Sequence, residues 1–196
     1  MPNTANKIKY GIKNCYYAKA TIASNGTATY GNPVALPGAV SMTLDANGDI
    51  TKFYADNIVY WSGANNNGYT GSLELALIPD SFKKDILGQT EQSTDKTLYE
   101  TVQATGSPFA LLFQFEGDAH NTKHVLYNCV ANRASIAGTT KNDTLEPQTE
   151  TINIEASSIY VAALDKDLVK CSTTADTTTT VNNSWVTTVY VPGATT

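Results

Sequence analysis

The stretch FALLFQFE at residues 109–116, followed by Gly-Asp at 117–118 and KHVLYNCVAN at 123–132, decides the fold class of this chain. In both segments apolar side chains occupy every second position, which is the periodicity of a strand with one buried face. The Gly-Asp turn between them predicts an antiparallel hairpin. The residues expected on its buried face are Phe109, Leu111, Phe113, Phe115, Val125, Tyr127, Cys129 and Ala131.

The same alternation recurs on both sides of this hairpin, at residues 7–22, 69–78 and 149–156. The first of these segments is long, and its pattern is interrupted near 11–14, which predicts either one long strand or two strands with a bend there. Asn25-Gly26 follows it and predicts a tight turn, because both residues tolerate a positive φ. Antiparallel hairpins are therefore expected to dominate the fold.

Elements outside this pattern are few. Pro79, Asp80 and the spacing of Phe82, Ile86 and Leu87 predict one short helix over 79–88. Weaker strands are expected at 97–102, 168–172 and 184–191, and the Thr-rich segment 173–183 is expected to be a loop. Residues 1–196 are thus predicted to form one all-β domain, a sandwich or barrel of about ten strands with one short helix.

Composition excludes several classes of function. The 196 residues include 13 Lys and Arg against 18 Asp and Glu, a formal net charge of −5, so no basic excess is available to bind phosphates. The longest purely apolar run, residues 159–164, is far shorter than the roughly 20 residues of a membrane-spanning helix. The three cysteines and the absence of a secretory signal predict free thiols and synthesis in a reducing cytoplasm. Cys15 and Cys129 lie in alternating segments and are expected to pack as small apolar residues.

Motifs for catalysis and metal binding are weak. The segment 45–49 lacks the glycine and glutamate that complete a calcium-binding loop, which favours a β-turn there. His120 and His124 lie on a predicted hairpin, where residues four apart are about 13 Å from each other and cannot share one ion. The sequence holds no nucleophile elbow or phosphate-binding loop, although convergence of two of the 18 acidic residues remains open. We therefore expect no enzyme activity, no cofactor and no metal.

Residues 53–69 concentrate aromatic side chains around an asparagine-rich stretch, interpreted as the tip of a hairpin. These aromatics could pack on their own domain. They could instead dock on another subunit, because Tyr and Trp are favoured anchors at interfaces. They could also stack on sugar rings, as in a carbohydrate-binding or adhesion β-sandwich module.

Several segments, taken in their order and spacing, resemble the major tail protein of long-tailed bacteriophages that infect Gram-positive bacteria. The resemblance covers residues 7–160 well and 185–191 more loosely, and the Thr-rich stretch 173–180 stands outside it. The segments that carry it are KYGIKN at 9–14, PGAV at 37–40, FYADN at 53–57, GSLELALIP at 71–79, PFALLF at 108–113, RASI at 133–136 and EPQTET at 146–151.

This resemblance implies a tail-tube fold, with a β-sandwich-like subunit and a flanking helix. It further implies homo-hexameric rings with a shared inner barrel, stacked into a tube through which genomic DNA passes at ejection. The implied location is the virion, and the implied partners are the tape measure protein, the tail terminator and the distal tail proteins. Residues 46–71 are the candidate stacking hairpin.

Two sets of candidate residues follow. The aromatic and asparagine-rich side chains of the hairpin are candidates for contacts between rings. An acidic or neutral lumen repels the duplex, so exposed acids and amides on the sheet are candidates for its lining. The ring-to-ring candidates are Tyr60, Trp61, Asn65, Asn66, Asn67 and Tyr69, and the lumen candidates are Glu74, Gln114, Glu116 and Glu155.

Overall fold

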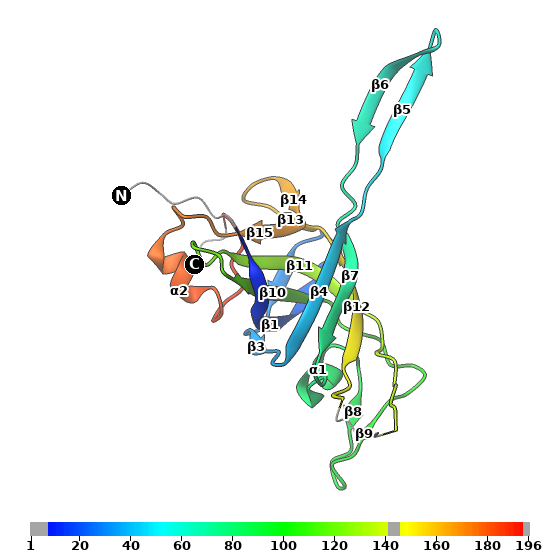
Figure 1. The fold of residues 1–196 in the computed structure, drawn as a ribbon, viewed down its shortest axis with the longest axis vertical. Helices are drawn as coiled ribbons and strands as arrows, with labels where there is room; N and C mark the ends of the chain where they lie inside the picture. The colour runs from blue at the N-terminus through cyan, green and yellow to red at the C-terminus, as the bar shows by residue number, and fades with distance from the viewer. Residues whose placement is uncertain (1–7, 141–145, 194–196) are drawn as a thin grey trace.

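The computed structural model describes residues 8–140 and 146–193, and Lys7, where the first predicted strand begins, lies outside them. In these two ranges the chain forms 15 strands and two short helices around one nine-stranded antiparallel sheet (Figure 1). The main path of the sheet is, in spatial order, β2 (Ala28–Tyr30), β1 (Tyr10–Ile22), β10 (Phe109–Glu116), β11 (Lys123–Ala131), β12 (Glu150–Ser157), β7 (Tyr69–Leu75) and β4 (Ala39–Ala46).

Shorter elements complete the fold. β3 (Val34–Ala35) adds to β1, and β15 (Lys170–Ser172) adds to β11. Three two-stranded ribbons lie outside the main sheet: β5 (Ile50–Ala55) with β6 (Ile58–Ala64), β8 (Thr90–Glu91) with β9 (Leu98–Tyr99), and β13 (Ile159–Val161) with β14 (Lys166–Leu168). The predicted strands at 97–102 and 168–172 are thus present in shorter form.

The hairpin predicted from 109–132 forms the centre of the sheet as β10 and β11. Both faces of β10 are buried, and Phe109, Leu111 and Leu112 are almost inaccessible to solvent. A strand covered on both faces must be apolar at consecutive positions, which explains the unbroken run Phe109–Phe113. The predicted all-β class is confirmed.

β1 bends where the interrupted pattern predicts it. Gly11 and Asn14 both have positive φ, at 57° and 50°, and the pairing of β1 with β10 shifts register beside each of them. A left-handed residue in a strand makes a bulge, and a bulge increases the local twist. The Asn14 Nδ2 amide donates to Oε1 of Gln114 at 2.7 Å, which holds the bulge against β10.

The sheet curls, so that β1 and β4 contact each other although they are far apart in its order. The main core fills the curl and is closed by α1 (Asp80–Asp85). From α1, the ring of Phe82 makes edge-to-face contacts with Tyr17 and Phe109 at centroid distances of 5.1 and 5.5 Å. The predicted helix therefore exists and covers the core, although it is shorter than 79–88.

The C-terminal segment differs from the prediction. A second helix, α2 (Thr179–Ser184), forms inside the segment expected to be a loop, and residues 184–191, expected to be a strand, continue as helical turns and coil. The carbonyl of Ser184 accepts from the backbone N–H groups of Thr187 and Thr188. Trp185 is 2% exposed in a second core on the opposite face of the sheet, stacked on Tyr190. Burial of this indole outweighs the β-propensity of its neighbours.

The ribbon β5–β6 projects from the body as a long arm, at the upper end of Figure 1. Its tip is Asp56-Asn57, with φ of 51° and 61° as a two-residue hairpin turn requires. The prediction of an asparagine-rich tip at 65–67 is wrong, because these residues lie where the arm joins the body. We call residues 50–64 the arm.

Candidate assembly surfaces

The arm exposes large apolar side chains on both faces. Phe53 and Trp61 are paired across the ribbon, as are Tyr54 and Val59, and side chains alternate between faces along each strand. Phe53, Tyr54 and Trp61 are each more than half exposed, and Tyr60 is 72% exposed. An isolated two-stranded ribbon has no core of its own. A ribbon that is apolar on both faces requires a partner surface to cover it.

Asparagine side chains brace the junction between arm and body. Oδ1 of Asn65 accepts from the Asp49 N–H at 2.5 Å, and Oδ1 of Asn66 accepts from the Gly68 N–H at 3.1 Å. The Asn67 N–H donates to the Asn47 carbonyl at 2.7 Å. Of the predicted ring-to-ring candidates, these three asparagines therefore hold the junction, while Tyr60 and Trp61 lie on the arm.

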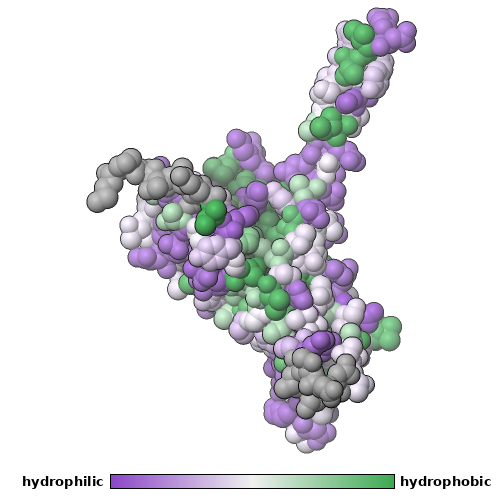
Figure 2. Space-filling model, in the orientation of Figure 1, coloured by the Kyte–Doolittle hydropathy of each residue, from purple (hydrophilic) through white to green (hydrophobic). Residues whose placement is uncertain are grey.

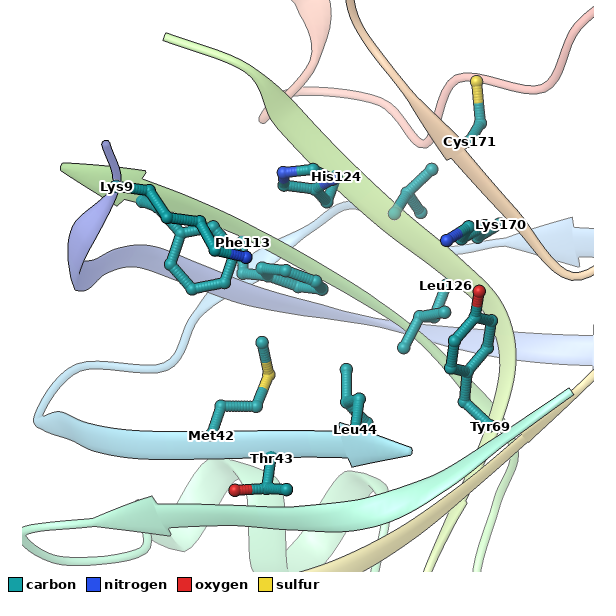
Figure 3. Close-up of a pocket in the computed structure, with 12 residues that line it drawn as sticks. Lys9, Met42, Thr43, Leu44, Tyr69, Phe113, His124, Leu126, Lys170 and Cys171 are labelled. Carbon is teal, nitrogen blue, oxygen red and sulfur yellow. The ribbon is translucent and has the colours of Figure 1, made fainter. Parts of the chain in front are cut away.

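Tyr69, the last ring-to-ring candidate, begins β7 in the body. Its ring lies 4.8 Å from Nζ of Lys170, a cation–π contact. It also lines a cavity of about 390 Å³ between β4 and the strands β10 and β11 (Figure 3). The structure thus separates Tyr69 from the aromatic residues of the arm.

The cavity is apolar with a basic rim. Figure 3 shows Met42, Leu44 and Phe113 directed into it, with Lys9 at one side and His124 behind Phe113. The ammonium group of Lys9 lies 4.5 Å from the centroid of Phe115, and the His124 ring stacks on Phe113 at 5.1 Å. Among residues 8–140 and 146–193, no three His, Cys, Asp or Glu side chains come together as a metal-binding group.

Burial lowers the pKa of His124 from its ordinary value of 6.5, and the positive charges of Lys9 and Lys170 add to this effect while Asp118 opposes it. The unfolded chain therefore binds more protons than the folded chain just below pH 6.5. The stability that this residue contributes is complete above pH 6.5 and is lost as the pH falls toward the lowered pKa.

We accordingly expect the unfolding free energy of the wild-type chain to decrease as the pH is lowered below 6.5, and His124→Gln to show a flatter profile in that range. Urea unfolding followed by tryptophan fluorescence at a series of pH values measures this. Equal slopes for the two chains would contradict the assignment. His120→Gln is the matched control, because it changes the other histidine of the chain.

Two of the three cysteines are buried packing residues. Cys15 and Cys129 are buried in the main core, and burial raises the pKa of the Cys15 thiol to about 11 and that of Cys129 to about 12. A thiol with so high a pKa is not a nucleophile at neutral pH. This part of the sequence-based prediction is confirmed by the burial of both side chains.

A second surface is the bare face of β12, β7 and β4. Residues paired across these strands form three rows of polar side chains on this face, and every charged residue in the rows is acidic. Glu74 is the central acid, and its carboxylate accepts from the hydroxyls of Ser41 and Thr149, each at 2.6 Å, which lowers its pKa. We call this the polar face. Its nine residues are Ser41, Thr43, Asp45, Thr70, Ser72, Glu74, Thr151, Asn153 and Glu155.

The four lumen candidates divide between two places. Glu74 and Glu155 share the polar face. Gln114 is 7% exposed and is held by Asn14 and by the Asn121 carbonyl, while Glu116 lies 3.8 Å from Lys13 at the end of β10. Periodicity alone does not tell the exposed acids from the buried Gln114, because all four candidates lie on the same side of the sheet. The C-terminal segment covers that side over β10 and leaves it bare over β7 and β12.

The sequence matches the family described as Phage tail tube protein over residues 3–177. The chain belongs to the phage tail tube protein family. This tail tube protein is therefore a structural component of the virion and not an enzyme. The match favours this role over the alternative of a carbohydrate-binding or adhesion module.

The other two comparisons do not add to the family assignment. No curated protein matches this tail tube protein. Among solved structures, it is similar to a chain in the cryo-EM structure of the anti-feeding prophage baseplate, 6-fold symmetrised, with a TM-score of 0.43 and 6% identity over 89% of this chain and 100% of that one. Family membership rests on the sequence match. In the described part of the chain, neither helix has the length and hydrophobicity to cross a bilayer.

Proposed function

We propose that this tail tube protein forms hexameric rings that stack into a tube, with the polar face lining a lumen through which DNA passes. The polar face supports this most directly. It is an uncovered sheet surface whose charged residues, Asp45, Glu74 and Glu155, are all acidic. Such a surface repels phosphate groups, so a duplex can slide past it without binding.

The edges of the sheet supply the means to close a ring. β4 ends the sheet on one side, and the three-residue strand β2 ends it on the other. An open edge offers unpaired N–H and C=O groups, which natural proteins pair or cover. Pairing each subunit's edge with its neighbour's continues the sheet around the ring and leaves no edge when the ring closes.

The arm supplies the contact between rings. It projects beyond the body and carries apolar side chains on both faces, so a neighbouring ring can bury it. Other tail components complete this assembly. The tape measure protein lies inside the tube, the terminator closes one end, and the distal tail proteins lie at the other end. Subunits are made in the cytoplasm of the infected bacterium before assembly.

The lumen assignment predicts a charge-dependent conduit. Asp45→Lys combined with Glu155→Lys should preserve tubes but slow DNA ejection, and the delay should diminish as salt is raised, because lysines bind phosphate and release counterions. Ejection rates from purified particles at several salt concentrations measure this.

Asp45→Asn with Glu155→Gln is the matched control, since it keeps the side-chain size and removes only the charge. It should eject DNA at close to the wild-type rate. Wild-type ejection by the double-lysine variant at low salt would show that the polar face lies elsewhere in the tube.

A further inference from the structure

A hollow of about 590 Å³ lies between the segment that follows β11 and Glu100, the residue after β9. It is formed where the chain leaves β11, near the β8–β9 ribbon at the lower end of Figure 1. Ile136 on its rim is fully exposed. Val102, in the segment that follows β9, is also fully exposed. Figure 2 shows hydrophobic surface along the arm, and a small hydrophobic projection on one side of the lower part of the body. The hollow is lined by Glu100, Asn132, Arg133, Ala134 and Ile136.

Arg133 distinguishes this hollow. It is the single arginine among the 13 basic residues of the sequence. One nitrogen of its guanidinium lies 2.5 Å from Oε1 of Glu100, while the side chain as a whole remains 75% exposed. Because a guanidinium has five donors, this bond orients the group and leaves further donors and its flat face for a partner.

The arm carries side chains that the guanidinium of Arg133 can bind. Asp56 lies in the turn at the tip, and the exposed Tyr54 and Tyr60 lie on the two strands that lead to it. Arginine pairs with carboxylates through two parallel hydrogen bonds and stacks on aromatic faces. Arginine and tyrosine are also the residues that most often dominate the energy of an interface.

We propose that the hollow around Arg133 and Ile136 receives the arm tip of a second copy of this chain in the adjacent ring. The proposal rests on the proposed role of the arm between rings and adds the surface that receives it. The arm and the β8–β9 ribbon, which adjoins the hollow through Glu100, lie at opposite ends of the long axis (Figure 1), so copies stacked along that axis bring the arm of one toward the hollow of the next. A contact between two different surfaces that repeats by translation along one axis does not close, so rings can continue to stack.

Mixing two variants tests this directly. The hollow variant carries Arg133→Glu and Ile136→Asp, and the arm variant replaces residues 50–64 by Asn-Gly. Each alone should give rings but no tubes. Mixed together, they should give pairs of rings and nothing longer, because an intact arm can dock on an intact hollow only once. Negative-stain imaging counts the rings in each particle.

The matched control is Arg133→Lys with Ile136→Leu, which keeps the charge and the apolar rim and should still give tubes, though shorter ones. Thermal unfolding of every variant must match that of the wild type, which the exposure of Arg133 and Ile136 favours. Normal tubes from the hollow variant would overturn the receiving surface and leave the role of the arm intact. Normal tubes from the arm variant would overturn the role of the arm itself. Single rings in the mixture would show that the hollow takes another partner.

Discussion

Removing the arm should abolish tubes while leaving the body folded. The Asn65 N–H donates to the Asp49 carbonyl at 3.2 Å, so the two ends of the arm lie side by side. A two-residue Asn-Gly turn can therefore replace residues 50–64 without opening the body. The arm adds no residue to either core, and we expect the melting temperature of the isolated subunit to change little. Electron microscopy should show no tubes.

A gentler variant separates the shape of the arm from its apolar surface. Phe53→Thr, Tyr54→Thr and Trp61→Thr keep a strand-forming residue at each position and remove the aromatic anchors. We expect this variant to fail in tube formation as the deletion does. If it forms tubes of normal length, the arm acts through its backbone and not through these side chains.

Phe109→Ala should destabilise the subunit more than any surface change. Phe109 is fully buried at the start of β10 and meets the ring of Phe82 edge to face. Truncation of a buried phenylalanine costs about 3–5 kcal/mol, a large part of the roughly 5–15 kcal/mol that stabilises a typical domain. Urea unfolding of the isolated subunit should show a midpoint shifted far to lower denaturant.

Phe53→Ala is the matched control for this prediction, because Phe53 is 59% exposed on the arm. Its effect on the unfolding free energy of the monomer should stay within about 0.5 kcal/mol, while its effect on tube formation should be clear. A comparable loss of monomer stability in both variants would mean that the arm folds back onto the body in solution.

Much of the fold could be predicted because its signals are local. Alternation at 109–132 predicts the central hairpin, the interrupted pattern at 11–14 predicts the bend in β1, and Phe82, Ile86 and Leu87 predict the face of α1 that enters the core. Each of these depends on the period of a strand or helix, which the chain carries in its own sequence.

The failures share a different cause. Asn-Gly and Asn-rich segments predict turns, but the sequence does not show that the turn at 65–68 braces a junction while Asp56-Asn57 forms the tip. Residues 184–191 have β-propensity, yet Trp185 finds a more favourable environment against the sheet. Propensity is local, whereas burial depends on which distant surface is available.

By itself the sequence determined an all-β subunit with little charge, whose acids outnumber its bases, and the order of its motifs placed it in its family. Only the tertiary structure decided which acids share a face. Glu74 and Gln114 have the same place in an alternating pattern, but the C-terminal segment buries one side of β10 and leaves β7 and β12 bare. Only the tertiary structure, too, put the arm at the opposite end of the molecule from the β8–β9 ribbon, and brought Glu100 beside Arg133. Alternation fixes the side of a strand on which a residue lies, whereas the packing of distant segments decides whether that side meets solvent, core or another subunit.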